Sequence, residues 1–334
     1  MRLSIIIVNY KTRQLLIDCI RSINQFDTSG TEIIVVDNFS QDDTEQALRQ
    51  HFPPVRFIQM GYNAGFARAN NAGIKAAQGA TVLLLNSDTL VRGNAIQHAL
   101  AKLLAAPGYC ACGVQLLNAD GSPQISGNFA MRGGLNYLLP LPYLGNFLKW
   151  IAGLFGMKKP NVPEATGMVE VDWINGAFLM VRQEAIRKAG MLDEDFFLYA
   201  EEAEWCSRLK KTGKLCIFGD EHVVHLQGES ATTAFQSSDK GYFNIYDRKG
   251  LQIMLSNMLR IRKQFGVGWY LFSLFIHVLE IPLFFTGLLF DSIISQGRPR
   301  YSFGKLRGFT ANVCRLIGFA PRILANRPYF YKVL

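Results

Sequence analysis

The chain has 334 residues, of which 49% are hydrophobic and 18% are charged. This length suffices for one large domain or for a domain with an appended region, and the composition excludes an intrinsically disordered protein. The net charge of +9 is uneven, because residues 248–334 hold thirteen Lys and Arg against only Glu280 and Asp291. The basic character therefore belongs to the C-terminal part.

The cysteines and the first residues bear on the cellular compartment. Six cysteines are scattered along the chain, and only Cys110 and Cys112 lie close together. This spacing favours neither a disulfide framework nor a zinc site and is typical of a reducing compartment. The chain opens on the strand-like run MRLSIIIVNY, without a basic segment followed by an apolar core and a cleavage site. We therefore expect no secretory signal and a cytoplasmic protein.

The first half of the chain alternates apolar runs with helical stretches. Short β-branched runs without polar alternation predict buried strands. Four such runs cover residues 4–10, 31–38, 55–60 and 81–88. Apolar residues recur at helical spacing from about Thr12, and a second helical stretch covers residues 66–79. Strands that alternate with helices predict an α/β fold with a mainly parallel central sheet.

Polar residues stand at the carboxyl ends of three of these strands. Asn9 ends the first strand, Asp37 and Asn38 end the second, and Asn86 with Asp88 ends the fourth. Ligands of parallel sheets bind beyond this edge, so the three polar ends indicate a binding site. Asn and Asp are also common turn formers, which is the alternative explanation.

The kind of phosphate site is restricted by the glycines. The first strand ends in VNYKT without a glycine, and no GxxxxGK[ST] segment is present. This excludes a Rossmann dinucleotide site and a P-loop, and it disfavours a nucleotidyltransferase with a Gly-rich triphosphate loop. A bound diphosphate would need a metal or side chains to neutralise it. Asp88 is the natural anchor for a hard divalent cation.

A helix is predicted from about residue 200, in the segment LYAEEAEWCSRL. Helical spacing places Glu201, Glu204 and Arg208 on one face, which we expect to meet solvent. It places Glu202 on the face of the apolar Trp205, where a carboxylate is costly unless it is paired or used in chemistry. Alternatively, Glu202 complements the positive end of the helix dipole.

Two further segments are informative. Residues 171–186 predict a strand that enters a helix. His225 follows an apolar pair in HVVHLQGES and is either a structural histidine or a ligand. Proximity of His225 to Asp88 would favour the ligand.

Seven segments, in this order, resemble the inverting family 2 glycosyltransferases, and most of all the branch of rhamnosyltransferases and related polysaccharide-building enzymes. They are VNYKT, VVDNFSQDDT, GYNAGFARANNAGI, LLLNSDT, DWINGAFLMVRQEA, LDEDFFLYAEEAEWCSRL and HLQGES. The resemblance covers residues 2–235. It implies a GT-A catalytic domain at residues 1–245, followed by a helical, basic region at residues 246–334. It also implies a donor sugar linked to dTDP or UDP and a divalent cation, Mg²⁺ or Mn²⁺.

The resemblance further implies roles for individual residues. Asn9 and Asp37 would hold the nucleobase and ribose, and Asp88 would bind the metal as the last residue of a motif similar to DxD. His225 matches a late histidine that binds the metal or the diphosphate. The other residues implied for the donor pocket and the acceptor cleft are Tyr10, Asn38, Asn63, Gly65, Asn70, Asn86, Trp173 and Gly176.

The glutamate pair matches the catalytic ED element of the family, with Glu202 as the general base beside Glu201. The chain departs from the family at two positions, because Asn86 removes the first DxD carboxylate and Glu202 is one methylene longer than an aspartate. The implied reaction is inverting transfer of a sugar, with rhamnose as one candidate, to a saccharide or lipid-linked hydroxyl in cell-surface polysaccharide synthesis. A catalytically silent, membrane-associated scaffold or binding subunit is the alternative.

The C-terminal region contains the apolar run at residues 269–290, in which only His277 and Glu280 are ionisable. The run is just long enough to cross a bilayer, but Glu280, Pro282 and basic residues on both sides disfavour a span. We expect a hydrophobic hairpin or helices on the inner leaflet, at the cytoplasmic face of the membrane. A span, a buried core helix and a homodimer helix are the alternatives. Nucleic acid is disfavoured, because the basic residues are interleaved with apolar stretches.

Overall fold

The computed structural model describes residues 2–156, 160–226, 235, 244–296 and 298–333. By their contacts the residues form two compact units, each described separately below. The first unit comprises Met1–Phe129, Asn161–Phe197 and Glu201–Ser230, and the second comprises Ala130–Pro160, Leu198–Ala200 and Ala231–Leu334. Residues 130–160 thus group with the C-terminal helices, whereas the expected division at residues 245 and 246 stays a prediction.

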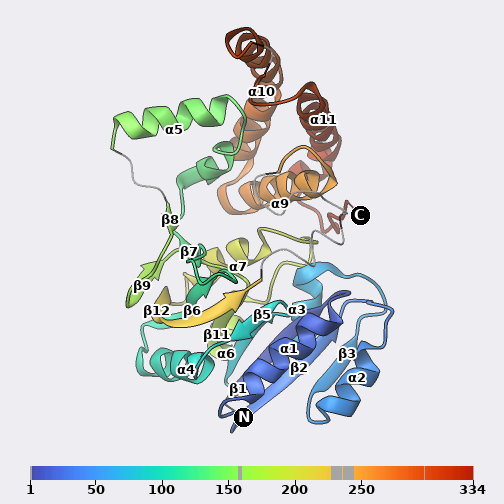
Figure 1. The fold of residues 1–334 in the computed structure, drawn as a ribbon, viewed down its shortest axis with the longest axis vertical. Coiled ribbons are helices and arrows are strands. Elements are labelled where there is room, and N and C mark those ends of the chain that lie inside the picture. The colour runs from blue at the N-terminus through green and yellow to red at the C-terminus, as the bar shows by residue number, and fades with distance from the viewer. Residues whose placement is uncertain (1, 157–159, 227–234, 236–243, 297, 334) are drawn as a thin grey trace. The chain divides into compact units, whose positions relative to one another are not determined.

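A large mixed sheet forms the centre of the first unit, with strand order β3-β2-β1-β4-β11-β6-β12-β5 and with β9 paired to β12 (Figure 1). Its strands are β1 (Leu3–Asn9), β2 (Thr31–Asp37), β3 (Arg56–Gln59), β4 (Thr81–Asn86), β5 (Thr89–Val91), β6 (Tyr109–Leu117), β9 (Met168–Val171), β11 (Phe178–Arg182) and β12 (Lys214–His225). The strands β3, β2, β1 and β4 are parallel neighbours, and β12 runs parallel to β6. The expected α/β fold with a mainly parallel sheet is confirmed.

Helices cover both faces of this sheet. They are α1 (Arg13–Asn24), α2 (Thr44–His51), α3 (Gly65–Ala76), α4 (Ala95–Ala105), α6 (Gln183–Ala189) and α7 (Glu201–Leu209). Side chains of α1, α2 and α4 join one apolar core, and those of α3, α6 and α7 join the other. Because β1 is covered on both faces, all its residues except Val8 are buried, which explains its continuous apolar sequence.

The helix α3 packs very closely on β1. A Cβ atom added at Gly73 would lie 2.4 Å from the side chain of Ile6, so only glycine permits this approach. A small second sheet, of order β10-β7-β8, completes the first unit. Its strands are β7 (Gly127–Asn128), β8 (Asn161–Val162) and β10 (Trp173–Ile174).

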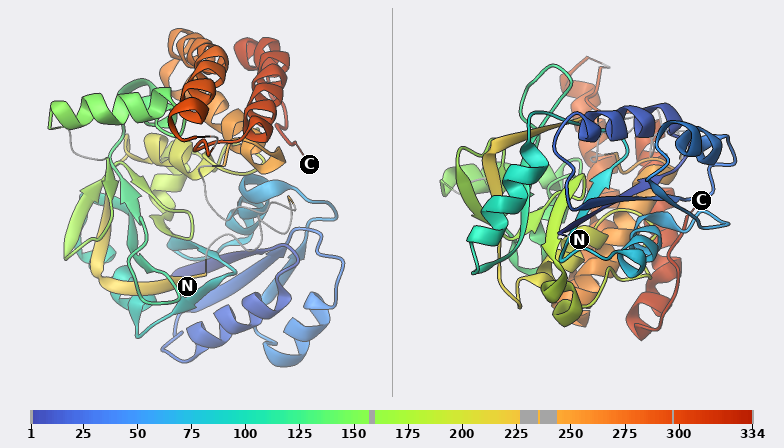
Figure 2. Two further views of the ribbon diagram at one scale, coloured as in Figure 1. Left: turned by 45° about the horizontal axis from the view of Figure 1, so that its top comes forward. Right: turned by 90° about the horizontal axis from the view of Figure 1, so that it is seen from below.

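The second unit is helical. It consists of η1 (Arg132–Leu138), α5 (Leu144–Leu154), α9 (Arg248–Phe265), α10 (Val267–Ile294) and α11 (Phe303–Ala325). The last three helices pack against one another, and they are drawn in orange to red in Figure 2. Asp247 and Ser302 cap α9 and α11, because their side chains accept hydrogen bonds from the backbone N–H groups of Gly250 and Lys305.

Most predicted elements of the first unit are found within a few residues of their expected bounds, including the strand β11 that leads into α6. The apolar run at residues 269–290 does not form a hairpin, because α10 continues unbroken through Pro282. It is the one described helix long and apolar enough to cross a membrane, by length and composition alone.

Candidate active site

The parallel pairing brings the polar strand ends to one edge of the sheet. Asn9 stands opposite Asp37 in the β1–β2 register, and Val8 stands opposite Asn86 in the β1–β4 register. Asn9, Asp37 and Asp88 are each at most 5% exposed, so these polar groups must find partners inside the protein. The fold therefore assembles residues that are far apart in the sequence, as expected for a site at this edge.

Asn9 and Asp37 belong to one hydrogen-bond network. The side-chain amide of Asn9 donates to Asp37 Oδ1 at 2.8 Å and to Ser40 Oγ at 3.0 Å. Asp37 also accepts from the Ser40 hydroxyl at 2.5 Å and from Gln59 Nε2 at 3.0 Å. With these donors the buried carboxylate of Asp37 is satisfied, and its position at the sheet edge is fixed. Sequence reasoning missed Ser40 and Gln59.

Asn38 organises the turn before α3. Its Oδ1 accepts from the backbone N–H of Ala64 at 2.7 Å, and its amide donates to Asn63 Oδ1 and to the carbonyl of Gly65. Gly65 has φ +73°, and a Cβ atom there would lie 2.1 Å from the Phe197 carbonyl oxygen. Only glycine fits at this position.

Two predicted residues have different surroundings. Asn70 is buried on α3, and its amide donates to the carbonyl of Phe66 one turn earlier at 2.9 Å. Tyr10 lies directly after β1 and is partly exposed, and the ammonium of Lys11 lies 5.5 Å from the centre of its ring. Asn70 is thus bonded within its own helix, whereas Tyr10 is accessible at the sheet edge.

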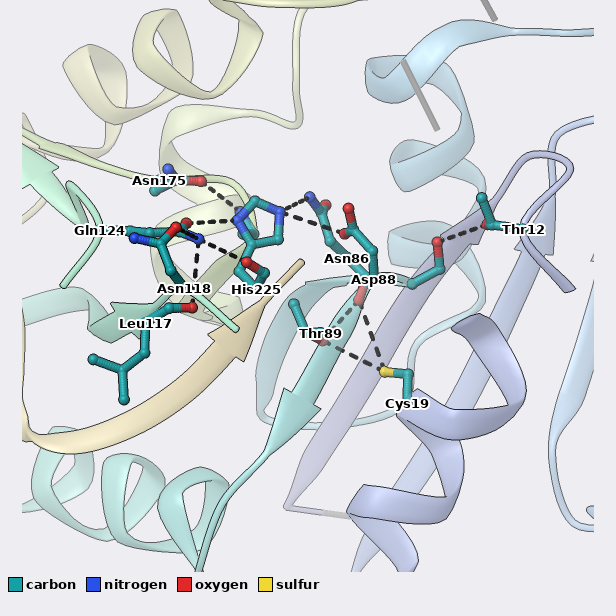
Figure 3. Close-up of polar contacts among 12 residues, drawn as sticks. Thr12, Cys19, Asn86, Asp88, Thr89, Leu117, Asn118, Gln124, Asn175 and His225 are labelled. Carbon is teal, nitrogen blue, oxygen red and sulfur yellow. Dashed lines mark hydrogen bonds and ion pairs between the residues drawn. The ribbon is translucent and has the colours of Figure 1, made fainter. Parts of the chain in front are cut away.

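Asp88 and His225 face each other at the end of β4 and β12. His225 Nε2 lies 3.4 Å from Asp88 Oδ1 and 3.4 Å from the amide nitrogen of Asn86 (Figure 3). The two segments are joined by backbone as well, since the N–H of Leu226 donates to the Asp88 carbonyl. The condition that favoured His225 as a ligand, its proximity to Asp88, is met.

Gln124 fixes the orientation of the His225 ring from the other side (Figure 3). Its Nε2 donates to the His225 carbonyl at 2.6 Å and to Asn118 Oδ1 at 2.8 Å, so its Oε1 is left to face His225 Nδ1 at 3.0 Å. An amide oxygen can only accept, so Nδ1 carries a proton, and Nε2 is the ring nitrogen that faces Asp88. Sequence reasoning missed Gln124, which lies 101 residues before the histidine that it orients.

This arrangement fits a divalent cation. His225 Nε2 and the carboxylate oxygen of Asp88 lie 3.4 Å apart, and a positive charge, on the imidazole ring or on a bound cation, would stabilise the pair. Two normal ligands of such ions are present, the carboxylate of Asp88 and an imidazole nitrogen of His225, whose ring is held by the amide of Gln124. Among the described residues no group of three or more His, Cys, Asp or Glu gathers. Asp88 and His225 would hold the ion as a pair.

The helix α7 differs from its predicted orientation. Glu201 and Glu204 are 2% and 7% exposed, so the face expected to meet solvent is buried. The predicted Glu204–Arg208 pair is present and bidentate, at 2.7 and 2.8 Å. The expectation was wrong because helical spacing shows which residues share a face, not which face neighbouring segments cover.

Glu202 is only partly buried, and it lies beside the loop that follows β10. A Cβ atom at Gly176 would lie 3.5 Å from Glu202 Cγ and 3.6 Å from Phe66. The next residue, Ala177, accepts from the backbone N–H of Asn86 at 3.1 Å. One short loop therefore separates Glu202 from the segment that carries Asp88.

Trp173 lies opposite Asn128 in the small second sheet. The indole Nε1 of Trp173 and the Oδ1 of Asn128 are buried and have no hydrogen-bond partner among the described residues. Within HLQGES, residues 227–230 lie outside the described part of the chain. Of the other predicted site residues, Asn9 with Asp37, Asn38 with Asn63 and Gly65, and Asp88 with Asn86 and His225 are brought into direct contact.

Comparison with known proteins relates this chain to a known family and fold. Residues 4–153 match the glycosyl transferase family 2. The chain is 28% identical over 254 residues to the low-salt glycan biosynthesis hexosyltransferase Agl10 of Haloferax volcanii, covering 74% of each chain. It is 26% identical over 236 residues to the N-acetylglucosaminyl-diphospho-decaprenol L-rhamnosyltransferase of Mycobacterium tuberculosis, covering 65% of this chain and 75% of the relative.

A solved structure shows the same fold. The crystal structure of GalNAc-T7 with UDP, GalNAc and Mn²⁺ superposes with a TM-score of 0.50 at 15% identity, over 81% of this chain and 56% of that one. The resemblance carried by the seven sequence segments is thereby confirmed. The chain contains a family 2 glycosyltransferase domain, matched at residues 4–153, and has the GT-A fold.

Proposed function

We propose that the protein is an inverting glycosyltransferase that moves a sugar from a dTDP- or UDP-linked donor to a hydroxyl of a saccharide or lipid-linked acceptor. The observation that carries this proposal is the facing pair of acceptors on Asp88 and His225, at the same sheet edge as Asn9 and Asp37. A cation site next to a polar pocket suits a nucleoside diphosphate, whose phosphates need a positive charge. Cell-surface glycan or polysaccharide synthesis is the proposed setting.

Asp88 and His225 would hold a divalent cation, Mg²⁺ or Mn²⁺, with Gln124 keeping the His225 lone pair directed at it. The ion would offset the charge of the leaving diphosphate. Asn86 replaces the first carboxylate of the usual motif, and its amide nitrogen lies 3.4 Å from His225 Nε2. The family relationship and the Mn²⁺ in the GalNAc-T7 structure support this role.

Glu202 is the proposed general base, and Glu201 is the buried neighbour that starts the same helix. The acceptor oxygen forms a bond to the anomeric carbon, the bond from that carbon to the diphosphate oxygen breaks, and the hydroxyl proton passes to the Glu202 carboxylate. One base opposite the leaving group inverts the configuration. Such a base contributes ~10²–10⁴ to the rate.

The remaining residues have proposed roles in binding. Asn9, Asp37 and Asn38 lie where the base and ribose of a donor would approach the sheet edge. Gly176 lies beside Glu202, and β10, which carries Trp173, packs against α7, so we assign Trp173 and Gly176 to the acceptor sugar. The rhamnosyltransferase relative makes rhamnose the first donor sugar to test.

A thermal-shift screen of nucleotide sugars with and without Mn²⁺ or Mg²⁺ tests the proposal. A bound donor raises the melting temperature by mass action, and we expect the rise to need the metal. Asp88→Asn should abolish the metal-dependent rise in melting temperature. Asp172 is a carboxylate on the same unit that is paired with Lys210, and Asp172→Asn should leave this rise unchanged. Donor binding without any turnover would instead support the scaffold or binding subunit.

We also propose that α10 and α5 lie on an anionic membrane surface at the cytoplasmic face. The helix α10 is inverted relative to a helix of a water-soluble core. Its polar residues Ser273, His277 and Glu280 are buried, whereas many of its apolar residues are exposed, among them Phe290 at 67% and Ile293 at 76%. Lipid is the solvent that this pattern fits.

The charge of the C-terminal region indicates which lipid headgroups it would bind. The two acidic residues of the segment 248–334 are both engaged, since Glu280 accepts from the backbone N–H groups of Tyr143 and Leu144, and Asp291 accepts from that of Arg300. The helix α5 begins at this Glu280 contact, and it exposes Phe147 and Trp150. The remaining exposed charge is basic, which favours anionic headgroups.

Vesicle flotation tests the membrane proposal. We expect the protein to float with phosphatidylglycerol vesicles and much less with phosphatidylcholine vesicles. The double change Phe290→Glu and Ile293→Glu should reduce flotation, whereas Leu104→Glu, an exposed apolar residue of the first unit, should not. A wild-type chain that stays unbound and forms a dimer, lost in the double variant, would assign the apolar face of α10 to a homodimer.

A further inference from the structure

The backbone before α7 has an unusual conformation. Tyr199 and Ala200, the two residues that precede Glu201, have φ of +72° and +66°. Residues other than glycine rarely adopt this left-handed region, and they keep it only where surrounding contacts impose it. Five of the seven non-glycine residues with positive φ in the described chain flank the proposed site, and they are Lys11, Phe39, Gln41, Tyr199 and Ala200.

Two hydrogen bonds hold the chain just before this strained pair. The Phe197 carbonyl accepts from the backbone N–H of Phe66 at 2.8 Å. The Leu198 carbonyl accepts from the hydroxyl of Ser256, on α9, at 2.7 Å. Ser256 is fully buried. These bonds hold Phe197 and Leu198, and the strained pair that follows leads directly into Glu201, the first residue of α7.

Ser256 is itself fixed by a second buried side chain. Gln252 Nε2 donates to Ser256 Oγ at 3.1 Å, so the Ser256 hydroxyl accepts one hydrogen bond and donates the other to Leu198. Gln252 also donates to the Tyr331 carbonyl and accepts from the Val333 N–H, each at 3.0 Å. A chain of hydrogen bonds thus runs from the C-terminal segment to the residue that precedes the strained pair.

We infer that Ser256 and Gln252 are positioning residues for the general base Glu202, and that the C-terminal segment at Tyr331 and Val333 holds them in place. This inference rests on the proposed role of Glu202. The hydroxyl of Ser256 keeps the carbonyl of Leu198, and with it the strained turn, in the one conformation that starts α7 at Glu201. Loss of that hydroxyl lets the turn relax and moves the carboxylate of Glu202, without touching the donor pocket.

The test compares Ser256→Ala with Ser273→Ala, which removes another buried hydroxyl from the same helical unit. We expect Ser256→Ala to lower kcat about tenfold at unchanged KM for the donor, and to shift the acidic limb of the kcat–pH profile. Ser256→Thr retains the hydroxyl and should recover activity, and Gln252→Met should behave like Ser256→Ala. Unchanged kcat in Ser256→Ala, or equal losses in Ser273→Ala, would overturn the inference.

Hydrogen–deuterium exchange separates this inference from the proposed function. Exchange of the amides at residues 199–204 should be faster in Ser256→Ala than in the wild type and in Ser273→Ala. Unchanged exchange of these amides refutes the positioning role of Ser256 even if the enzyme is active. If exchange increases in Ser256→Ala but Glu202→Gln retains full turnover, Ser256 positions α7 and Glu202 is not the general base.

Discussion

The sheet edge of the first unit and the helix α10 of the second both bury polar side chains, but for different purposes. At the sheet edge, His225 Nε2 lies 3.4 Å from Asp88 Oδ1, and we propose that this pair holds a cation. In α10, Glu280 accepts two backbone N–H groups and His277 Nδ1 bonds the Ser273 carbonyl, so these groups are satisfied within the protein. Polar burial thus serves ligand binding in one region and helix docking in the other.

The largest expected effect tests the chemical side of this comparison. Glu202→Gln should lower kcat by ~10²–10⁴, because the amide cannot accept the acceptor proton. It should change stability little, since Glu202 is only partly buried. Turnover of donor and acceptor is the measurement, with donor binding followed by thermal shift.

Glu194→Gln, an acidic residue on the same unit with a partly exposed side chain, serves as the control and should retain near-normal turnover. Near-normal turnover in Glu202→Gln, with donor still bound, would remove Glu202 from the role of base.

For Glu280, whose role is structural, we expect the mutation to lower stability. Glu280→Ala leaves the buried N–H groups of Tyr143 and Leu144 without their acceptor, so it should destabilise the second unit by about 2–3 kcal/mol. Thermal unfolding measures this loss. Asp291→Asn changes the other, more exposed acidic residue of the region and should cost less than about 0.5 kcal/mol. A Glu280→Ala protein as stable as Asp291→Asn would contradict the docking role.

The orientation of His225 gives an intermediate effect. Gln124→Met removes the oxygen that keeps the proton on Nδ1, so the lone pair of Nε2 is no longer held toward Asp88. Loss of a hydrogen bond that orients a metal-binding histidine typically weakens metal affinity about 10–100-fold. We expect this weakening in a titration of Mn²⁺ with donor present, and a matched change at the surface residue Gln97 should leave the affinity unaltered. Equal affinities in both variants would refute the orienting role.

Sequence reasoning succeeded where the signal is local. The β-branched runs of β1, β2 and β4 predict buried parallel strands because both faces of these strands are covered, and the strand ends Asn9, Asp37 and Asn86 follow from the same pattern. Asp88 and His225 were recognised as candidates from residue type and order. Their contact depends on the pairing of β12 with β5, which no local pattern encodes.

Two of the residues that sequence reasoning missed, Gln124 and Ser256, act through distant partners. Gln124 orients His225 across 101 residues, and Ser256 anchors Leu198 across 58. Glutamine and serine carry no signal of burial in themselves, so only the tertiary packing reveals their use. The burial of Glu201 was missed because helical spacing does not show which face of α7 the neighbouring segments cover.

The smallest expected effect concerns a polar group of the first unit that is purely structural. Burial would raise the pKa of Glu32, but hydrogen bonds from Ser4, the Gln78 N–H and Arg56 outweigh it and lower the pKa below the ordinary 4.5. The carboxylate therefore stabilises the fold above the pKa of the unfolded chain, and this stabilisation is lost as the pH falls through the native pKa. Glu32→Gln should cost about 1–2 kcal/mol at pH 7 and progressively less below pH 4. Urea unfolding at several pH values measures the difference. A stability difference between wild type and Glu32→Gln that grows as the pH falls would show that the charge of Glu32 does not stabilise the sheet.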